Sequence, residues 1–234
     1  VHTLDVETAG GDDSEPRTLA CSIAPLHRPG NRGVGVVINL TDITERRIQE
    51  ERSEYLAMHD ALTGLMNRTA LNARLQELIS QAQRKPDAPD WAVLFIDLDG
   101  FKPINDALGH HVGDDVLITT ANRIREIAPR PDLCFRLGGD EFVVVVTGVR
   151  DALDALPVAT AIVEGIQKQI EVGRNTVSVR ASIGVTIHPR DGNSVGSVLR
   201  NADLAMYEAK ASDDVIRFFT DDINTRVMER MHLE

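Results

Sequence analysis

The sequence predicts an α/β domain over residues 61–219, in which helices pack on the faces of a β-sheet. Two observations support this fold class. Short apolar strands alternate with long amphipathic helices along this segment, and chains with this pattern bury the strands in a sheet that the helices cover. In addition, 42% of the 234 residues are hydrophobic, which is enough to fill a core.

Before this domain, the sequence predicts a β-hairpin and a connecting helix. The strand-like segments TLACSIAPL and GVGVVINL are separated by the turn-rich HRPGNRG. The charged segment TDITERRIQEERSEYLAMHD follows, in which Thr41 or Asp42 is suited to cap a helix and Ile48 and Tyr55 recur at heptad spacing. Because fewer than three heptads are present, a connecting helix is favoured over a coiled coil.

The elements of the α/β domain follow from two periodicities. Apolar residues that recur every three or four positions predict helices, and apolar runs bounded by turn residues predict strands. In chain order, these patterns give the helix RTALNARLQELISQAQR, the strand WAVLFID, the helix GDDVLITTANRIREIA, the hairpin FRLGGDEFVVVV, a helix near 151–170, the strand TVSVRASIGVTIH, the helix SVLRNADLAMYEAK and the short strand VIRFF. In the hairpin, Gly138 and Gly139 permit the positive backbone angles that a tight turn needs.

Charge and composition narrow the classes of function. The formal net charge of −11 argues against a nucleic acid as partner, whereas a phosphate ligand held through a metal ion stays compatible with it. No apolar run approaches the roughly 20 residues that span a bilayer and no secretory signal is evident, so we expect a cytoplasmic location. Because the chain begins at Val1, we expect a fragment whose upstream part could hold a membrane anchor. Cys21 and Cys134 lie far apart in the chain, so we expect them to be buried free thiols rather than a disulfide, as is usual in a reducing compartment.

Acidic residues follow one predicted strand and begin another. The strand WAVLFID ends in Asp97, and the second strand of the hairpin begins at Asp140 and Glu141. If the two strands are neighbours, Asp97 and Asp140 converge at one edge of the sheet. Together with the carbonyl oxygen of Leu98, they would form an oxygen-rich site suited to Mg²⁺. Taken alone, however, the GGDE turn is equally typical of a solvated hairpin.

Several ordered motifs carry a resemblance to a known family. They are DALTGLMNR, DLDGFKPIND, GHHVGDDVL, RLGGDEF, ASIGV and NADLAMYEAK. With these motifs, the chain from about Asp60 to Phe219 resembles the GGDEF family of diguanylate cyclases, which join two GTP molecules into cyclic di-GMP. The resemblance implies a nucleotidyl-cyclase-like, palm-type fold whose central sheet is mixed and mainly antiparallel. The preceding GVGVVINLTDITERR resembles the last strands and exit of a PAS sensor domain.

The resemblance implies catalytic and metal-binding roles at the acidic residues. Asp97, the Leu98 carbonyl and Asp140 match positions that hold a divalent metal ion, Mg²⁺ or Mn²⁺. Glu141 matches the second acid of the signature, with a role in metal binding or proton transfer. An exposed hairpin carboxylate is the alternative for Glu141.

Other matching positions imply contacts with the nucleotide. Lys102, the backbone near Phe101, and Lys210 would contact phosphates. Asn105 and Asp114 match the pair that recognises guanine, whose N1–H and amino group suit a carboxylate acceptor. The alternatives are a solvated lysine at 102, a helix cap at 105 and a first-turn acid at 114.

Two departures from the family pattern bear on function. The product-inhibition site of the family has an Arg-x-x-Asp motif, but Pro129 stands at the arginine position, Arg130 is displaced by one residue, and Asp132 keeps the acid. Feedback binding of cyclic di-GMP is therefore not expected, because a guanidinium clamp depends on its direction. After Lys210, Asp214 replaces an arginine that contacts GTP phosphates, so we expect weaker binding.

The resemblance also divides the chain. Residues 1–45 are expected to be the C-terminal part of a PAS domain, 46–59 a connecting signalling helix, 60–220 the GGDEF domain, and 221–234 a C-terminal helix similar to those that lead into an EAL phosphodiesterase domain. A charged terminal helix without that purpose is the alternative for the last segment.

Three functions are compatible with the sequence. The first is an active, PAS-controlled cyclase, which must form a homodimer because each subunit presents one GTP to the other. The second is a catalytically weak or inactive GTP-binding domain that regulates an attached EAL domain. The third is an interaction scaffold. A scaffold would not need the acidic motifs, which are intact in this sequence.

Overall fold

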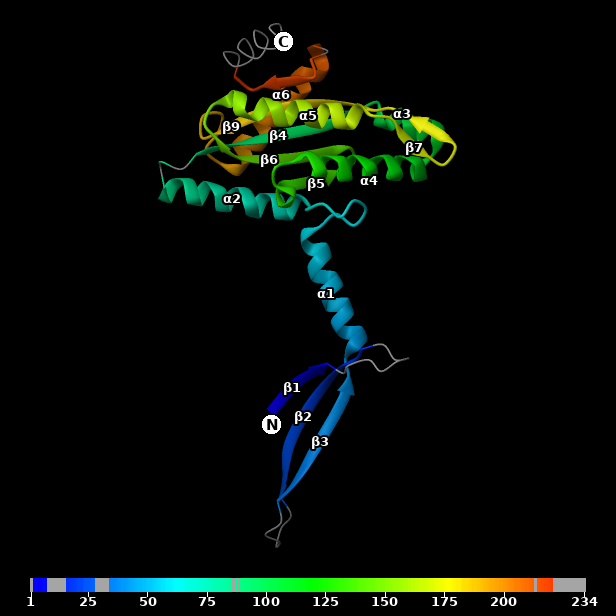
Figure 1. The fold of residues 1–234 in the computed structure, drawn as a ribbon. Coiled ribbons are helices and arrows are strands. Elements are labelled where there is room, and N and C mark those ends of the chain that lie inside the picture. Colours follow the sequence, from blue (N-terminus) through cyan, green and yellow to red (C-terminus); the bar gives the residue numbers. More distant parts are fainter. Residues whose placement is uncertain are drawn as a thin grey trace. The chain divides into compact units, whose positions relative to one another are not determined.

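The computed structural model describes residues 2–7, 16–27, 34–85, 87, 89–212 and 214–220. The chain forms two compact units, Val1–Ala57 and Met58–Glu234, and each is described by itself (Figure 1). None of the described helices combines the length and the apolar character needed to cross a membrane.

The first unit is a three-stranded antiparallel sheet followed by a helix. The strands β1 (His2–Glu7), β2 (Thr18–His27) and β3 (Val34–Asp42) are ordered β1-β2-β3, and α1 spans Thr44–Met58. The predicted β2–β3 hairpin and the connecting helix are confirmed, whereas β1 was not predicted. The carboxylate of Asp42 accepts hydrogen bonds from the backbone N–H of Thr44 at 3.0 Å and from its hydroxyl at 2.6 Å. Asp42, one of the two predicted caps, therefore stabilises the start of α1.

The second unit is built on a five-stranded sheet. Across the sheet, the strands are β10 (Ile216–Phe218), β9 (Arg180–His188), β4 (Asp90–Asp99), β6 (Glu141–Val149) and β5 (Cys134–Gly138). Only the β10–β9 pair is parallel, so the predicted mixed, mainly antiparallel sheet is confirmed. A separate two-stranded sheet pairs β7 (Ile170–Val172) with β8 (Asn175–Val177).

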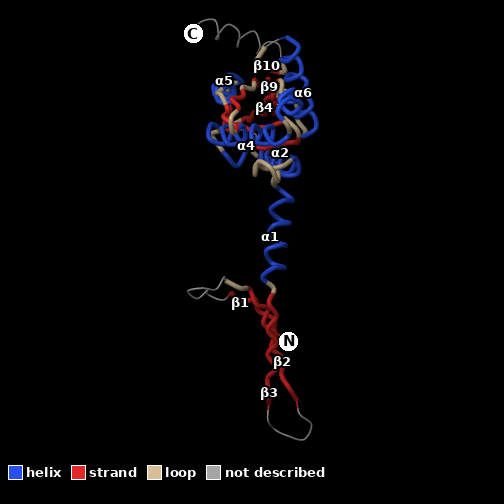
Figure 2. Tube along the Cα trace, turned by 90° about the vertical axis from the view of Figure 1, so that its right-hand side faces the viewer, coloured by secondary structure: helices blue, strands red, loops and turns tan. Residues whose placement is uncertain are grey.

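Helices cover both faces of the five-stranded sheet. They are α2 (Arg68–Arg84), α3 (Phe101–Leu108), α4 (His110–Ile127), α5 (Leu156–Gln167) and α6 (Val195–Ser212). Successive residues of a strand point to opposite faces: Leu94 and Ile96 join the core shared with α4 and α5, whereas Val93 and Phe95 join the core shared with α2 and α6. Figure 2 shows β4 and β9 between α5 on one side and α6 on the other.

Several elements of the second unit differ from the sequence prediction. The helix expected near 151–170 is a short 3₁₀ turn, η2 (Ala152–Ala155), followed by α5, which ends at Gln167. At Lys168 the backbone becomes extended, and the guanidinium of Arg123 donates hydrogen bonds to the carbonyl groups of Ile166, Lys168 and Gln169 at 2.6–3.3 Å. The strand expected from Thr176 to His188 is divided into β8 and β9, and α3 and β7 were not predicted. The helix expected at 221–234 lies outside the described residues.

Candidate active site

The edge of the sheet where β4 ends and β6 and β9 begin gathers four carboxylates, and we name it the acidic edge (Asp97, Asp99, Asp140 and Glu141). Asp97 lies opposite Glu141 of β6 and, on its other side, opposite Ser182 of β9. The backbone N–H of Leu98 donates a hydrogen bond to the carbonyl oxygen of Asp140 at 3.3 Å. The predicted convergence of Asp97 and Asp140 from neighbouring strands is therefore confirmed.

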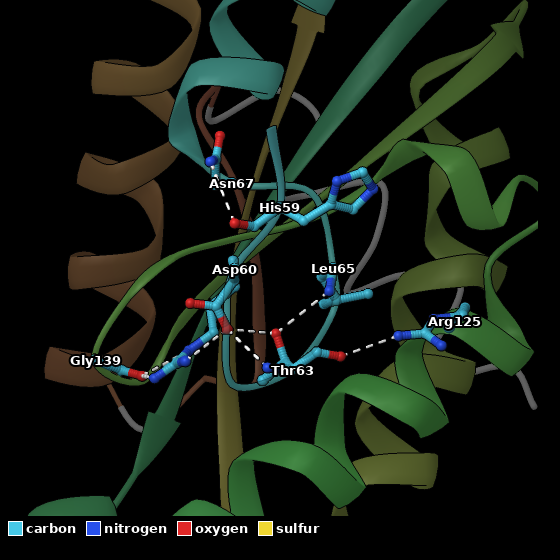
Figure 3. A network of polar contacts seen from close by, with 8 residues as sticks. His59, Asp60, Thr63, Leu65, Asn67, Arg125 and Gly139 are labelled. Atoms are coloured by element: carbon cyan, nitrogen blue, oxygen red, sulfur yellow. Dashed lines mark hydrogen bonds and ion pairs between the residues drawn. The ribbon is translucent and has the colours of Figure 1, made fainter. Parts of the chain in front are cut away.

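The turn that carries Asp140 is held from behind by Arg136. Gly138 and Gly139 have φ angles of 139° and 53°, which glycine adopts without the strain that a side chain would bring. The guanidinium of Arg136, only 9% exposed, donates to the carbonyl of Gly139 from Nε at 3.2 Å and from Nη2 at 2.8 Å. Its Nη1 donates at 2.8 Å to the carboxylate of Asp60, which also accepts from Thr63 (Figure 3). This network fixes the turn to the segment that enters the domain.

A lysine lies on the acidic edge. The ammonium group of Lys210, near the end of α6, forms an ion pair with Asp97 and lies 3.7 Å from Oδ1 of Asp99. Burial and the negative charges of Asp140 and Asp99 raise the pKa of Asp97 against the effect of Lys210. Burial would lower the pKa of Lys210, but the hydrogen bond and the charge of Asp97 outweigh it and raise that pKa. The edge therefore has more negative charge than one lysine neutralises.

Glu141 is partly exposed beside the same edge. Its Oε2 lies 3.6 Å from Nη2 of Arg68, at the start of α2. Burial raises the pKa of Glu141, as do the charges of Asp203, Asp97 and Asp140, and Arg68 only partly offsets these effects. Glu141 therefore holds a proton more readily than a solvated hairpin carboxylate does. This favours a functional role for Glu141 over the alternative of an exposed hairpin carboxylate.

The segment after β4 presents backbone N–H groups beside the acidic edge. Gly100 has a φ angle of 77° and turns the chain directly into α3, whose first residue is Phe101. The first N–H groups of a helix have no partner within the helix and favour anions. Phe101 is buried, whereas Lys102 is exposed. The two predicted phosphate contacts thus lie at a helix start that the sequence did not reveal.

The two residues predicted to recognise guanine lie on adjacent helices. Asn105 is on α3 and Asp114 is on α4. A Cβ atom built on Gly113 would lie 1.9 Å from Oδ1 of Asn105, so the amide packs directly against the backbone next to Asp114. This buried Oδ1 accepts no hydrogen bond from any residue that the structure describes. A buried polar atom without a partner is costly, which fits an amide that bonds to a ligand.

A cavity of about 460 Å³ adjoins the Lys210 side of the acidic edge. Its lining includes Asp99, Arg180, Ser182, Lys210 and Asp214. The Ser182 hydroxyl donates to Asp99 at 2.9 Å. The sequence analysis assigned no role to Arg180 or Ser182. The ASIGV motif could have indicated them, because Ser182 belongs to this motif and Arg180 directly precedes it.

The oxygen donors at the acidic edge make an open site. Within the described ranges, no three histidine, cysteine or acidic side chains are arranged as a metal-binding group. The predicted set of Asp97, Asp140 and the Leu98 carbonyl contains only two such side chains, so further ligands would have to come from phosphates or water.

Comparison with known proteins gives a consistent result. The family profile described as "Diguanylate cyclase, GGDEF domain" matches residues 57–214. Over 179 residues, the chain is 44% identical to the bifunctional diguanylate cyclase/cyclic di-GMP phosphodiesterase MucR of Pseudomonas aeruginosa, covering 76% of this chain and 26% of MucR. It is 34% identical over 207 residues to the cyclic di-GMP phosphodiesterase PdeR of Escherichia coli, covering 88% of this chain and 30% of PdeR.

A solved structure shares the fold. The GGDEF domain of YfiN, also called TpbB, from Pseudomonas aeruginosa superposes with a TM-score of 0.63 at 39% identity, covering 67% of this chain and 97% of that domain. The chain spans about a quarter to a third of the length of MucR and PdeR. Because the profile covers more than half of the residues and the acidic edge contains the signature, the chain belongs to the GGDEF family of diguanylate cyclases.

Proposed function

We propose that this chain is a diguanylate cyclase, which condenses two GTP molecules into cyclic di-GMP and releases pyrophosphate. The reaction would take place in the cytoplasm, in a homodimer in which each subunit presents one GTP to the other, under the control of the N-terminal region that resembles a PAS domain. The observation that carries the proposal is the meeting of Asp97, Asp140 and Lys210 at one edge of the sheet.

The donor set fits Mg²⁺ or Mn²⁺. Asp97, Asp140 and the Leu98 carbonyl are hard oxygen ligands, and the raised pKa of Asp97 reflects burial and neighbouring negative charge that a divalent cation would relieve. When bound, the ion would supply activation of a ribose 3′-hydroxyl and stabilisation of the leaving pyrophosphate.

The chain's own residues would bind and orient GTP. Lys102 and the N–H groups at the start of α3 suit the phosphates, while Asn105 and Asp114 suit the edge of guanine. Glu141, whose pKa is raised by burial and nearby acids, is suited to accept a proton or to assist in holding the metal.

The proposal is tested by incubating the purified chain with GTP and Mg²⁺ and following cyclic di-GMP by chromatography. Asp140→Asn, which removes a metal ligand from an exposed turn, should abolish the product and leave the thermal unfolding curve almost unchanged. Product from the wild type that disappears in the variant would support the cyclase. Equal production by both would refute the role of Asp140.

A second function is favoured by one departure from the family pattern. Asp214 stands where the family pattern has an arginine, and the relatives MucR and PdeR are described as phosphodiesterases, with or without a cyclase activity. The chain would then be a weak or inactive GTP-binding domain that regulates an attached EAL domain. GTP binding without any cyclic di-GMP from a demonstrated dimer would support this second function against the first.

A further inference from the structure

We infer that Arg180 binds the terminal phosphates of the nucleotide, and that it supplies the guanidinium that position 214 lacks. The inference rests on the proposed function, because it identifies how the same site holds GTP. It concerns the cavity of about 460 Å³ beside the acidic edge, which Arg180, Lys210, Asp99 and Asp214 line together.

The negative charge of Asp214 is partly compensated within the chain. Its Oδ2 accepts a hydrogen bond from the Ser212 hydroxyl at 2.7 Å and lies 3.3 Å from Nη1 of Arg217. Arg217 also lies 2.9 Å from Oε2 of Glu208. Asp214 therefore does not present an isolated charge to the cavity, and Arg217 is already engaged by two acids. The replacement of arginine by aspartate at 214 therefore removes a cation, and Arg217 neutralises only part of the negative charge that the aspartate adds.

Arg180 is placed to provide the missing cation. It is the first residue of β9 and lies opposite Asp99, the last residue of β4, so the strand register fixes its backbone at the acidic edge. Its side chain is exposed and lines the cavity. Among the residues that the structure describes, it forms no side-chain hydrogen bond or ion pair. Lys210, by contrast, is engaged by Asp97.

The chemistry of the cavity suits a polyphosphate. Asp99 is held by the Ser182 hydroxyl at 2.9 Å and lies 3.7 Å from Lys210, so its charge is also partly compensated. Ala181 and Ala209 line the cavity with small side chains and leave space beside the two cations. A guanidinium can bind two phosphate oxygens at once, whereas an ammonium group acts as a point charge. Arg180 and Lys210 together would thus bind the terminal phosphates, the part of the nucleotide farthest from guanine.

The test measures binding of GMP, GDP and a GTP analogue with a non-hydrolysable α,β-methylene link, by calorimetry in the presence of Mg²⁺. For Arg180→Gln, we expect affinity for the GTP analogue to fall about tenfold, affinity for GDP to fall less, and affinity for GMP to stay unchanged. Arg180→Lys should lie between the variant and the wild type, because it keeps the charge and loses the two-point contact. Arg174→Gln, an exposed arginine in the β7–β8 turn outside the cavity lining, controls for the change in net charge.

The outcomes separate this inference from the proposed function. Wild-type affinity for the GTP analogue in Arg180→Gln, or an equal loss for all three nucleotides, would overturn the role of Arg180 while leaving a GTP site in place. Failure of the wild-type chain itself to bind any guanine nucleotide would overturn the proposed function and this inference with it. Matching unfolding temperatures of the wild type and the two Arg180 variants would show that a loss of affinity is not a loss of fold.

Discussion

Lys210 and Asp97 form an ion pair across the acidic edge, although 113 residues separate them in the chain. Asp97 is a proposed metal ligand, and Lys210 is expected to contact phosphates. In the structure, the lysine thus provides the positive charge that a divalent cation would otherwise bring to Asp97. Binding of metal and nucleotide at this edge would require Lys210 to leave Asp97 and turn toward the phosphates.

We therefore predict that Lys210→Met strengthens metal binding while weakening nucleotide binding. Without the competing ammonium group, affinity of the nucleotide-free chain for Mn²⁺ should rise about fivefold, since a partly exposed ion pair contributes about 1 kcal/mol. Affinity for GTP should fall, because a phosphate contact is lost. Electron paramagnetic resonance of free Mn²⁺ measures the first effect without any turnover.

Arg200→Met is the matched control for this experiment, because Arg200 is an exposed cation on the same helix. It should leave Mn²⁺ affinity as in the wild type. Unchanged or weaker Mn²⁺ binding in Lys210→Met would show that the lysine does not compete for Asp97.

Much of the domain could be predicted from sequence, for physical reasons that particular elements illustrate. The apolar run Trp91–Ile96 is typical of a strand buried on both faces, and in the structure it forms most of β4. Asp97 at the end of this run predicted where the candidate site lies. In contrast, α3 has eight residues including Pro103, too few for a clear helical period, and β7 has three residues. Such short elements are stabilised by the tertiary structure rather than by local pattern.

The candidate site, too, could be predicted only in part. The approach of Asp97 to Asp140 could be predicted, because the end of one antiparallel strand lies beside the start of its neighbour. The pairing of Lys210 with Asp97 and the place of Arg180 depend on how α6 and β9 pack beside β4, which no local pattern records. An exposed arginine at the start of a strand looks like any surface residue.

The second prediction concerns the Asp60–Arg136 network behind the turn (Figure 3). Asp60→Asn should lower the free energy of unfolding by about 2–3 kcal/mol, since it leaves the buried guanidinium of Arg136 without its ion pair. Burial would raise the pKa of Asp60, but the hydrogen bonds from Thr63 and Arg136 outweigh it and hold that pKa below its usual value. The stabilisation is thus complete above about pH 5 and is lost as the pH falls through the lowered pKa of the folded state.

Urea unfolding at pH 7 and below pH 4 checks both statements, and the wild type and Asp60→Asn should differ less at the acidic pH. Asp132→Asn is the matched control, because Asp132 forms a similar ion pair with Arg130 in which both side chains are about half exposed. The free energy of unfolding of that variant should equal that of the wild type. A pH-independent difference between Asp60→Asn and wild type would contradict the assigned ionisation.

The third prediction concerns Gly113, which makes space for Asn105. A methyl group at position 113 would lie 1.9 Å from Oδ1 of Asn105, so Gly113→Ala must displace that amide. Alanine favours a helix by about 1 kcal/mol over glycine, which offsets part of the steric cost in stability. We expect GTP affinity to fall about tenfold, as expected for a lost hydrogen bond at a buried site, with a smaller loss for ATP.

Gly196→Ala controls for the helix effect of this change, because Gly196 lies in α6 with no atom within 4 Å of an added Cβ. It should leave nucleotide affinity unchanged and preserve or raise the unfolding temperature. Normal GTP affinity in Gly113→Ala would show that Asn105 does not bind guanine.

The fourth prediction is that cyclic di-GMP does not inhibit this chain. The cavity of about 430 Å³ near the displaced inhibition motif contains two arginines, Arg74 and Arg130. Both are already paired: Arg74 with Glu77, and Arg130 with Asp132 through hydrogen bonds of 3.1 and 2.6 Å. A phosphate would have to displace these carboxylates, and no arginine stands at position 129 to add a further contact.

Initial rates of GTP turnover should therefore stay constant as cyclic di-GMP is added, whereas Pro129→Arg should introduce inhibition. Calorimetry with Asp140→Asn, alone and combined with Pro129→Arg, measures cyclic di-GMP binding without turnover and should give a stronger signal for the double variant. Strong inhibition of the wild type would show instead that Arg130 exchanges Asp132 for the phosphate of the product. Inhibition would then depend on the strength of one exposed ion pair, and Asp132→Asn, which weakens that pair, would increase it.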